Sequence, residues 1–199
     1  MSHIEHLSRD KRLKKAMTAV GPVELRGSND LMNDLFASII SQQLSTKVAR
    51  VIHSRFLDLY SGKKPTAEQV LASSLEVLRS IGLSLAKAQY MHNVARFFIE
   101  KGLSNKQIRK MNDEAVIHLL TQIKGVGRWT VEMLLMFSLK REDVFAVDDL
   151  GIQQGMISLY KLEKEPKKKL KEDMQRIAAK WSPYRTYACL YLWRWKDGV

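Results

Sequence analysis

The sequence contains a single cysteine, Cys189, among its 199 residues. One thiol excludes an internal disulfide, and it also excludes a four-cysteine metal or iron–sulfur site. Long apolar runs are missing as well. No stretch approaches the roughly 20 apolar residues that a membrane-spanning helix needs, and residues 1–15 lack the apolar core of a secretory signal. We therefore expect a cytoplasmic protein without a membrane partner, associated with the nucleoid in a bacterium or located in the nucleus in a eukaryote.

Acidic residues are in the minority. The chain has 33 lysine and arginine residues against 21 aspartate and glutamate residues, which gives a formal net charge of +12 and a pI near 9.8. The electrostatic field of such a positive charge concentrates polyanions at the protein surface, so nucleic acid is the first partner to consider. A hydrophobic content of 45% is enough to bury a core. A folded, nucleic-acid-binding protein is therefore favoured, and a merely basic globular protein is the alternative.

The alternating pattern of a β-strand is nearly absent, whereas apolar residues recur at helical spacing along most of the chain. Capping residues and glycine or proline breaks set the expected helix ends. We expect helices over residues 30–60, interrupted near 41–45, and over 67–81, 84–101, 112–120, 129–139, 149–160, 166–181 and 183–195. These helices predict one all-α domain over residues 1–199, whose first and last helices are candidates for a separate lobe.

A glycine-rich turn joins two of these helices into a hairpin over about residues 113–139. Gly125 and Gly127 let the backbone turn tightly and aim N–H groups outward at the start of the next helix, where a phosphate can bind. Lys124 and Arg128 would add attraction that is independent of DNA sequence. The pattern therefore favours DNA binding, although a G-x-G motif by itself also fits an ordinary helix–turn–helix corner.

Backbone carbonyls of the same turn form a candidate cation site. The carbonyls of Thr121, Ile123 and Gly125 could hold a monovalent ion, Na⁺ or K⁺, against the bound phosphate. The five histidines show no zinc-binding spacing. No other cofactor is expected.

Two adjacent acids, Asp148 and Asp149, precede the predicted helix 149–160. An aspartate at a helix start is commonly an N-cap, and we expect one of the pair to have that role. A carboxylate held near bound DNA can also stabilise the positive charge that develops on deoxyribose as a base leaves, or orient the attacking water. Both catalytic roles stay open.

Taken together, the hairpin, the tandem acids and the segment that separates them resemble the helix-hairpin-helix DNA glycosylases of the alkylpurine type, 3-methyladenine DNA glycosylase II. Four stretches match in order within residues 29–195: 38–45 (SIISQQLS), the hairpin with Trp129, 144–151 (VFAVDDLG) and 182–193. The resemblance implies a two-lobed all-α fold with the active-site cleft between the lobes. It also implies a monomeric base excision repair enzyme that acts on duplex DNA containing an alkylated purine.

The resemblance also implies roles for individual residues. Asp149 is the implied catalytic carboxylate, and Asp148 has a capping or supporting role. Gln43 fills the gap left by the extruded nucleotide, with Leu44 as the second candidate. The implied DNA contacts are Gln42, Gln43, Leu44, Lys124, Gly125, Val126, Gly127, Arg128 and Thr130. Lys124 and Val147 stand where prolines are common, and the chain has no additional N-terminal β-rich domain, which leaves the range of lesions open.

Trp129 decides the expected reaction class. Bifunctional relatives carry a lysine two residues after the second hairpin glycine, and its amine forms a Schiff base with the sugar. Because that position is Trp129 here, we expect hydrolysis by water and no lyase activity. An indole face gains about 0.5–2 kcal/mol of cation–π energy from a positively charged alkylpurine. Trp193 is implied as a second pocket aromatic, and it could equally fill the core.

Two rival functions remain. One is a non-catalytic, structure-specific DNA-binding helix-hairpin-helix module; a carboxylate that faces phosphates gives such a binder no advantage. The other is an enzyme for oxidised or mismatched bases, which Trp129 and the absence of a four-cysteine cluster disfavour.

Overall fold

The computed structural model describes residues 2–198, and every regular element in that range is a helix, which confirms the predicted all-α class. The chain divides into two compact units. One comprises Ser28–Leu134, and the other comprises the described residues up to Gly27 together with those from Leu135 onward. None of the described helices is both long and apolar enough to cross a membrane.

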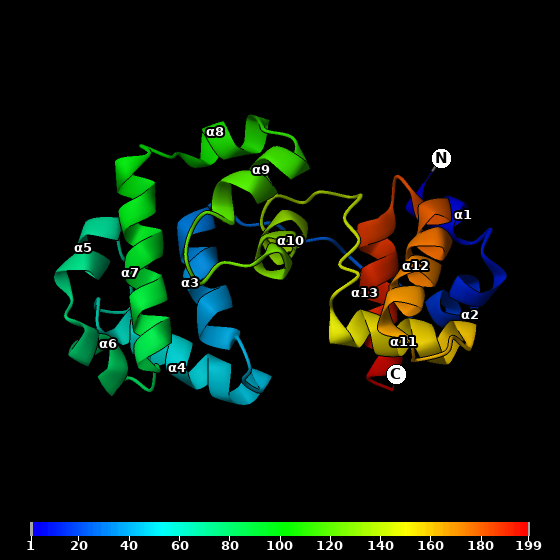
Figure 1. Ribbon diagram of the computed structural model, residues 1–199, viewed down its shortest axis with the longest axis horizontal. Coiled ribbons are helices and arrows are strands. Elements are labelled where there is room, and N and C mark those ends of the chain that lie inside the picture. Colours follow the sequence, from blue (N-terminus) through cyan, green and yellow to red (C-terminus); the bar gives the residue numbers. More distant parts are fainter. Residues whose placement is uncertain (1, 199) are drawn as a thin grey trace. The chain divides into compact units, whose positions relative to one another are not determined.

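The central unit is built around α7 (Leu85–Glu100), which packs against α3 (Leu31–Ser41) and α5 (Ala67–Ala72) (Figure 1). Apolar side chains such as Leu35 and Met91 are fully buried, because helical spacing gathers them on the facing sides of these helices. The other helices of this unit are α4 (Thr46–Asp58), α6 (Leu75–Ser80), α8 (Asn105–Lys110), α9 (Asp113–Leu120) and the start of α10 (Arg128–Phe137).

Short polar side chains set the helix boundaries. Asp30, Ser84 and Asn112 each accept a backbone N–H at a predicted helix start. The predicted helix 67–81 is wrong as a single element, because the Ser74 side chain accepts the N–H of Val77 and starts a new helix there. The predicted ranges also omit α8, which opens with a capping box.

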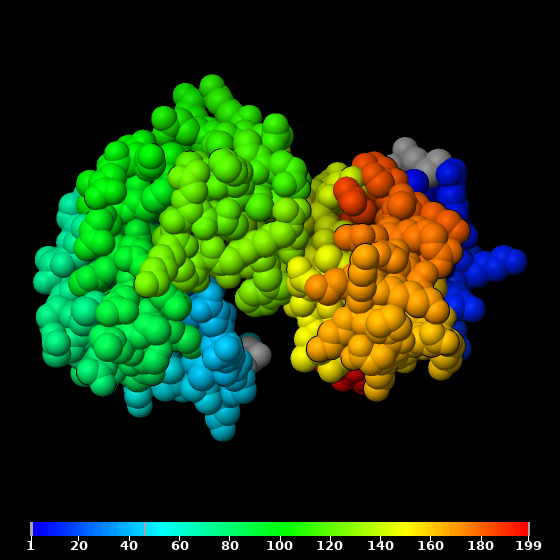
Figure 2. Space-filling model, in the orientation of Figure 1, coloured from blue at the N-terminus to red at the C-terminus, as the bar shows by residue number. Residues whose placement is uncertain are grey.

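The second unit joins the two ends of the chain. The N-terminal helices α1 (His3–Leu7) and α2 (Lys11–Val20) belong to it. So do α11 (Leu150–Tyr160), α12 (Lys167–Ala178), the 3-10 helix η1 (Ala179–Trp181) and α13 (Arg185–Lys196). Helix α13 packs against both α2 and α11. Figure 2 shows the blue N-terminal residues and the orange C-terminal helices within one continuous surface.

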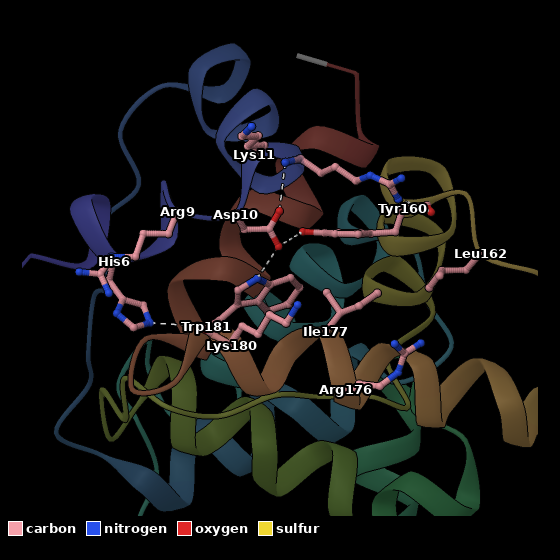
Figure 3. A pocket seen from close by; sticks show the side chains of 11 residues that line it. His6, Arg9, Asp10, Lys11, Tyr160, Leu162, Arg176, Ile177, Lys180 and Trp181 are labelled. Atoms are coloured by element: carbon pink, nitrogen blue, oxygen red, sulfur yellow. Dashed lines mark hydrogen bonds between the residues drawn. The ribbon is translucent and has the colours of Figure 1, made fainter.

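Asp10 ties α2 to the C-terminal helices (Figure 3). Its Oδ2 accepts the Tyr160 hydroxyl at 2.7 Å and the Trp181 indole N–H at 3.1 Å. Its Oδ1 accepts the backbone N–H groups of Arg12 and Leu13. Burial by itself raises the pKa of Asp10, but these four hydrogen bonds favour the carboxylate more strongly and hold the pKa below its ordinary value. The ionised carboxylate therefore stabilises the fold.

Asp10→Asn is expected to destabilise the protein by about 1–3 kcal/mol at pH 7, because charge-assisted hydrogen bonds are lost. A depressed pKa contributes stability above the unfolded pKa, and that contribution is lost as the pH falls through the folded pKa. The difference between the two proteins should therefore shrink in acid. Urea unfolding at pH 7 and pH 3 measures it, with Glu172→Gln, an exposed carboxylate of the same unit, as the matched control. A difference that is unchanged at pH 3 would contradict the assigned role.

Candidate functional site

The turn between α3 and α4 exposes two of the predicted DNA contacts. Gln43 has φ +58°, in the left-handed region, and its side chain is exposed. A residue other than glycine costs about 1–3 kcal/mol in such a conformation, so the surrounding contacts must hold the turn. Gln43 lines one cavity, described below. Leu44, 36% exposed, lines another hollow, together with Ala37 and His53. The two gap-filling candidates therefore lie on different surfaces.

Gln42 faces the hairpin. Its Nε2 donates to the carbonyl of Gly125 at 3.3 Å and to Oγ1 of Thr130 at 3.4 Å. Its own backbone carbonyl accepts the amine of Lys87 at 2.7 Å. The Gln42 side chain thus links the end of α3 to the hairpin, and its implied role as a DNA contact stays a prediction.

Only one of the two hairpin glycines is required by the turn. Gly125 has φ +103°, and a Cβ on it would lie 2.1 Å from the ring of Tyr90. Gly127 has no positive φ, and a Cβ on it would meet no atom within 4 Å. The prediction that both glycines serve the turn therefore holds for Gly125 alone. Gly127 instead leaves the backbone at the start of α10 open to a close approach.

Arg128 is held by carboxylates. Its guanidinium pairs with Glu114 at 2.8 Å and with Glu132, which is 5% exposed, at 3.0 Å. Arg128 therefore joins α9 to α10, and because its side chain is still 53% exposed, its predicted attraction to phosphate stays a prediction. Lys124 is exposed as well.

The side chains of Val126 and Thr130 are buried, with 4% and 2% of their surface exposed. Val126 packs in the core and Oγ1 of Thr130 accepts from Nε2 of Gln42, so burial leaves little of either side chain for DNA. The DNA contacts predicted for Val126 and Thr130 stay predictions.

Two of the predicted cation ligands already accept hydrogen bonds. The Ile123 carbonyl accepts the N–H of Val126 at 2.9 Å, and the Gly125 carbonyl accepts Nε2 of Gln42. A carbonyl oxygen carries two lone pairs, so one donor does not exhaust it. The cation site, including Thr121, stays a prediction.

A cavity of about 510 Å³ gathers Gln43, Gly127 and Trp129 in the central unit. Its volume falls in the range of small-molecule sites. The complete lining consists of Gln42, Gln43, Ser84, Ala86, Lys87, Tyr90, Gly127, Trp129 and Thr130. The structure thus brings the implied gap-filling residue and the implied base-contacting tryptophan to one cavity.

In the other unit, Asp149 is fixed at the start of α11. Its Oδ1 accepts the N–H of Ile152 at 2.8 Å, as an N-cap, and the indole N–H of Trp193 at 2.7 Å. A Cβ at Gly151 would lie 2.8 Å from Trp193 and 3.1 Å from that oxygen, which explains the glycine. The capping role predicted for Asp148 is wrong, because Asp149 caps the helix and Asp148 pairs with Lys171 at 2.5 Å.

The segment that leads to Asp149 is braced by the start of α13. Arg185 donates to both oxygens of Asp143, at 2.7 and 2.9 Å, and the Oγ1 of Thr186 accepts the N–H of Val144 at 3.0 Å. Burial raises the pKa of Asp143, but the hydrogen bonds from Arg185 and Ser182 outweigh it and keep the pKa below its usual value. This brace fixes the backbone six residues before the helix cap.

A model of the HhH-GPD superfamily of base excision DNA repair proteins matches residues 36–180, which include the hairpin and Asp149. The chain belongs to this superfamily. It is 37% identical to DNA-3-methyladenine glycosylase 1 of Schizosaccharomyces pombe over 186 residues, which cover 92% of this chain and 80% of that protein.

Solved structures of HhH-GPD relatives share the fold. The S. pombe 3-methyladenine DNA glycosylase Mag1, in complex with abasic DNA, superposes with a TM-score of 0.88 at 34% identity and covers 97% of this chain and 95% of its own. A DNA-3-methyladenine glycosidase from Bacillus halodurans gives 0.81 at 37% identity, over 97% and 88%. The predicted family is confirmed.

Sequence reasoning missed several residues of this HhH-GPD site. Lys87 and Tyr90 line the same cavity as Trp129, yet they lie about 40 residues before it in the sequence. Glu132 and Glu114, which hold Arg128, were likewise not singled out. A lysine at the start of an amphipathic helix carries no local signal of such a contact.

Proposed function

We propose that this HhH-GPD protein is a monofunctional, monomeric DNA glycosylase of the 3-methyladenine DNA glycosylase II type. It removes alkylated purines from duplex DNA by hydrolysis of the N-glycosidic bond, in the nucleoid or the nucleus. The observation that carries the proposal is the Asp149 carboxylate, which the N–H of Ile152 and the indole of Trp193 hold by one oxygen.

Asp149 acts on the sugar. When the bond between the base and the sugar breaks, its electron pair leaves with the purine and positive charge develops on deoxyribose. A fixed carboxylate stabilises that charge, or it accepts a proton from the water that adds to the sugar. The two hydrogen bonds on Oδ1 restrict rotation of the side chain, so little reorganisation is needed as the charge develops.

Trp129 and Trp193 suit a positively charged base. An alkylated purine is already a good leaving group, so a permissive aromatic surface and one carboxylate suffice for catalysis. Trp129 offers its indole to the cavity that also contains Gln43, and a cationic purine against such a ring gains about 0.5–2 kcal/mol. Trp193 orients Asp149 through its N–H. Trp129 also supports hydrolysis without strand cleavage, since it occupies the position of the Schiff-base lysine of bifunctional relatives.

DNA binding uses the hairpin and the turn after α3. The open backbone at Gly127 and the exposed Lys124 receive a phosphate, and Na⁺ or K⁺ at the carbonyls of Thr121, Ile123 and Gly125 would strengthen that contact. Gln43 fills the space of the extruded nucleotide, because it shares the cavity with Trp129, whereas Leu44 lines a different hollow.

The test is chromatographic identification of the bases released from methylated genomic DNA. Free alkylated purines should appear in proportion to enzyme and time. Tight binding to alkylated duplexes with no released base would favour a non-catalytic DNA-binding module instead.

The same preparation, incubated with abasic duplex DNA and borohydride, should trap no covalent adduct, because no lysine stands at position 129. An adduct would show that another amine attacks the sugar and would overturn the monofunctional assignment.

A further inference from the structure

One side of α7 contacts both DNA-binding elements of the central unit. Lys87, Tyr90 and Asn93 follow one another at a spacing of three residues, so they share a side of the helix. The Lys87 amine donates to the carbonyl of Ile40 at 2.9 Å and to that of Gln42 at 2.7 Å. The amine thereby caps the C-terminal end of α3, next to Gln43.

The next two residues of this side contact the hairpin. The ring of Tyr90 packs so closely on Gly125 that no Cβ fits there. The Nδ2 of Asn93 donates to the carbonyl of Lys124 at 3.1 Å. A single rigid helix is therefore in contact with the turn and with the hairpin.

A direct hydrogen bond also joins the turn to the hairpin. Gln42, whose carbonyl accepts from Lys87, also donates through its Nε2 to the carbonyl of Gly125. The turn, the hairpin and α7 thus form a ring of contacts around the cavity that contains Gln43 and Trp129.

Core packing by itself does not account for Lys87. Its side chain is half-buried, and a methionine would fill the same space. Such a methionine would leave two carbonyls at a helix end without their donor, where a cation is favoured. The amine is therefore suited to fixing the conformation of the turn, in which Gln43 adopts a left-handed φ.

We propose that the α7 side formed by Lys87, Tyr90 and Asn93 is a positioning element, which sets the distance between the gap-filling Gln43 and the phosphate-binding hairpin. This inference rests on the proposed function. Misplacement of a catalytic or positioning group by about 1 Å can cost a hundredfold in rate. A fixed distance lets Gln43 enter the duplex at the correct nucleotide while the hairpin holds the phosphate.

A double-mutant cycle of Lys87→Met and Gln43→Ala tests the proposal. The probes are a duplex with one N7-methylguanine, the same strand without its complement, and an abasic duplex with 2-aminopurine opposite the abasic site. Each single variant should lower single-turnover release from the duplex about tenfold, and the double variant should also lower it about tenfold, because both changes disable one function. Release from the single strand, which has no gap to fill, should change little.

Matched variants separate positioning from stability. Lys106→Met removes the same charge from an exposed site on α8 and should change the rate less than about twofold. Lys87→Arg keeps a cation that donates to carbonyls and should recover most of the rate. Asn93→Ala, a milder change on the same side of α7, serves if Lys87→Met unfolds. Binding to the abasic duplex should change 2-aminopurine fluorescence, and that change should shrink equally in Lys87→Met and Gln43→Ala.

Losses that multiply to about a hundredfold in the double variant, or an unchanged fluorescence response in Lys87→Met, would overturn the positioning role while leaving the glycosylase function intact. If the unaltered protein releases no N7-methylguanine, the proposed function fails instead, and the fluorescence of the abasic duplex still reports the position of Gln43.

Discussion

Asp149→Asn is expected to lower the single-turnover rate of base release by at least about a hundredfold, because it removes the charge that stabilises the cationic sugar. The asparagine Oδ1 can still accept the N–H groups of Ile152 and Trp193, since asparagine is as good an N-cap as aspartate. The fold and the affinity for abasic duplex should therefore be retained. Excision kinetics on an N7-methylguanine duplex, together with fluorescence anisotropy, measure the two effects.

Asp148→Asn is the matched control for Asp149→Asn. It removes a neighbouring carboxylate whose partner, Lys171, is itself on the surface, and such pairs contribute little. Its rate should stay close to that of the unaltered protein. Full activity of Asp149→Asn, or equal losses in both variants, would refute the catalytic assignment.

Gly125→Ala is expected to destabilise the central unit by about 2–4 kcal/mol. The new methyl group would meet the ring of Tyr90, and alanine is strained at φ +103°. DNA affinity should fall with stability because the hairpin deforms. Urea unfolding and anisotropy with abasic duplex DNA measure both quantities.

Gly127→Ala gives the contrasting result. Its methyl group would meet no protein atom within 4 Å, so stability should change by less than about 1 kcal/mol. DNA affinity should nevertheless fall, because the methyl group would stand where a phosphate approaches the start of α10. A stable Gly125→Ala variant, or a Gly127→Ala variant with unchanged affinity, would show that the two glycines are assigned the wrong roles.

Local signals were enough to predict much of the fold. Asn112 caps α9 and Asp149 caps α11, and in both cases the polar side chain and the helix that it starts are adjacent in sequence. The broken helix at Ser74 shows where such signals compete, since a serine within an apolar pattern fits both a helix interior and a cap.

The candidate site was less predictable because its contacts join distant residues. Two neighbouring acids are equally good caps, so the sequence could not decide between Asp148 and Asp149. Arg128 lies next to the hairpin glycines, and only the packing of α9 reveals that Glu114 meets its charge. The bond from Gln42 to Gly125 spans 83 positions, and no periodicity encodes it.

The N-cap role of Asp149 and its proposed catalytic role together have a consequence for the evolution of this protein. Aspartate and asparagine codons differ by one nucleotide, and the amide preserves the bonds that begin α11. Natural selection on folding alone would therefore not remove that replacement. Under the proposed function, a gene duplicate that is no longer needed for repair could carry asparagine at position 149 and persist as a well-folded paralogue without glycosylase activity.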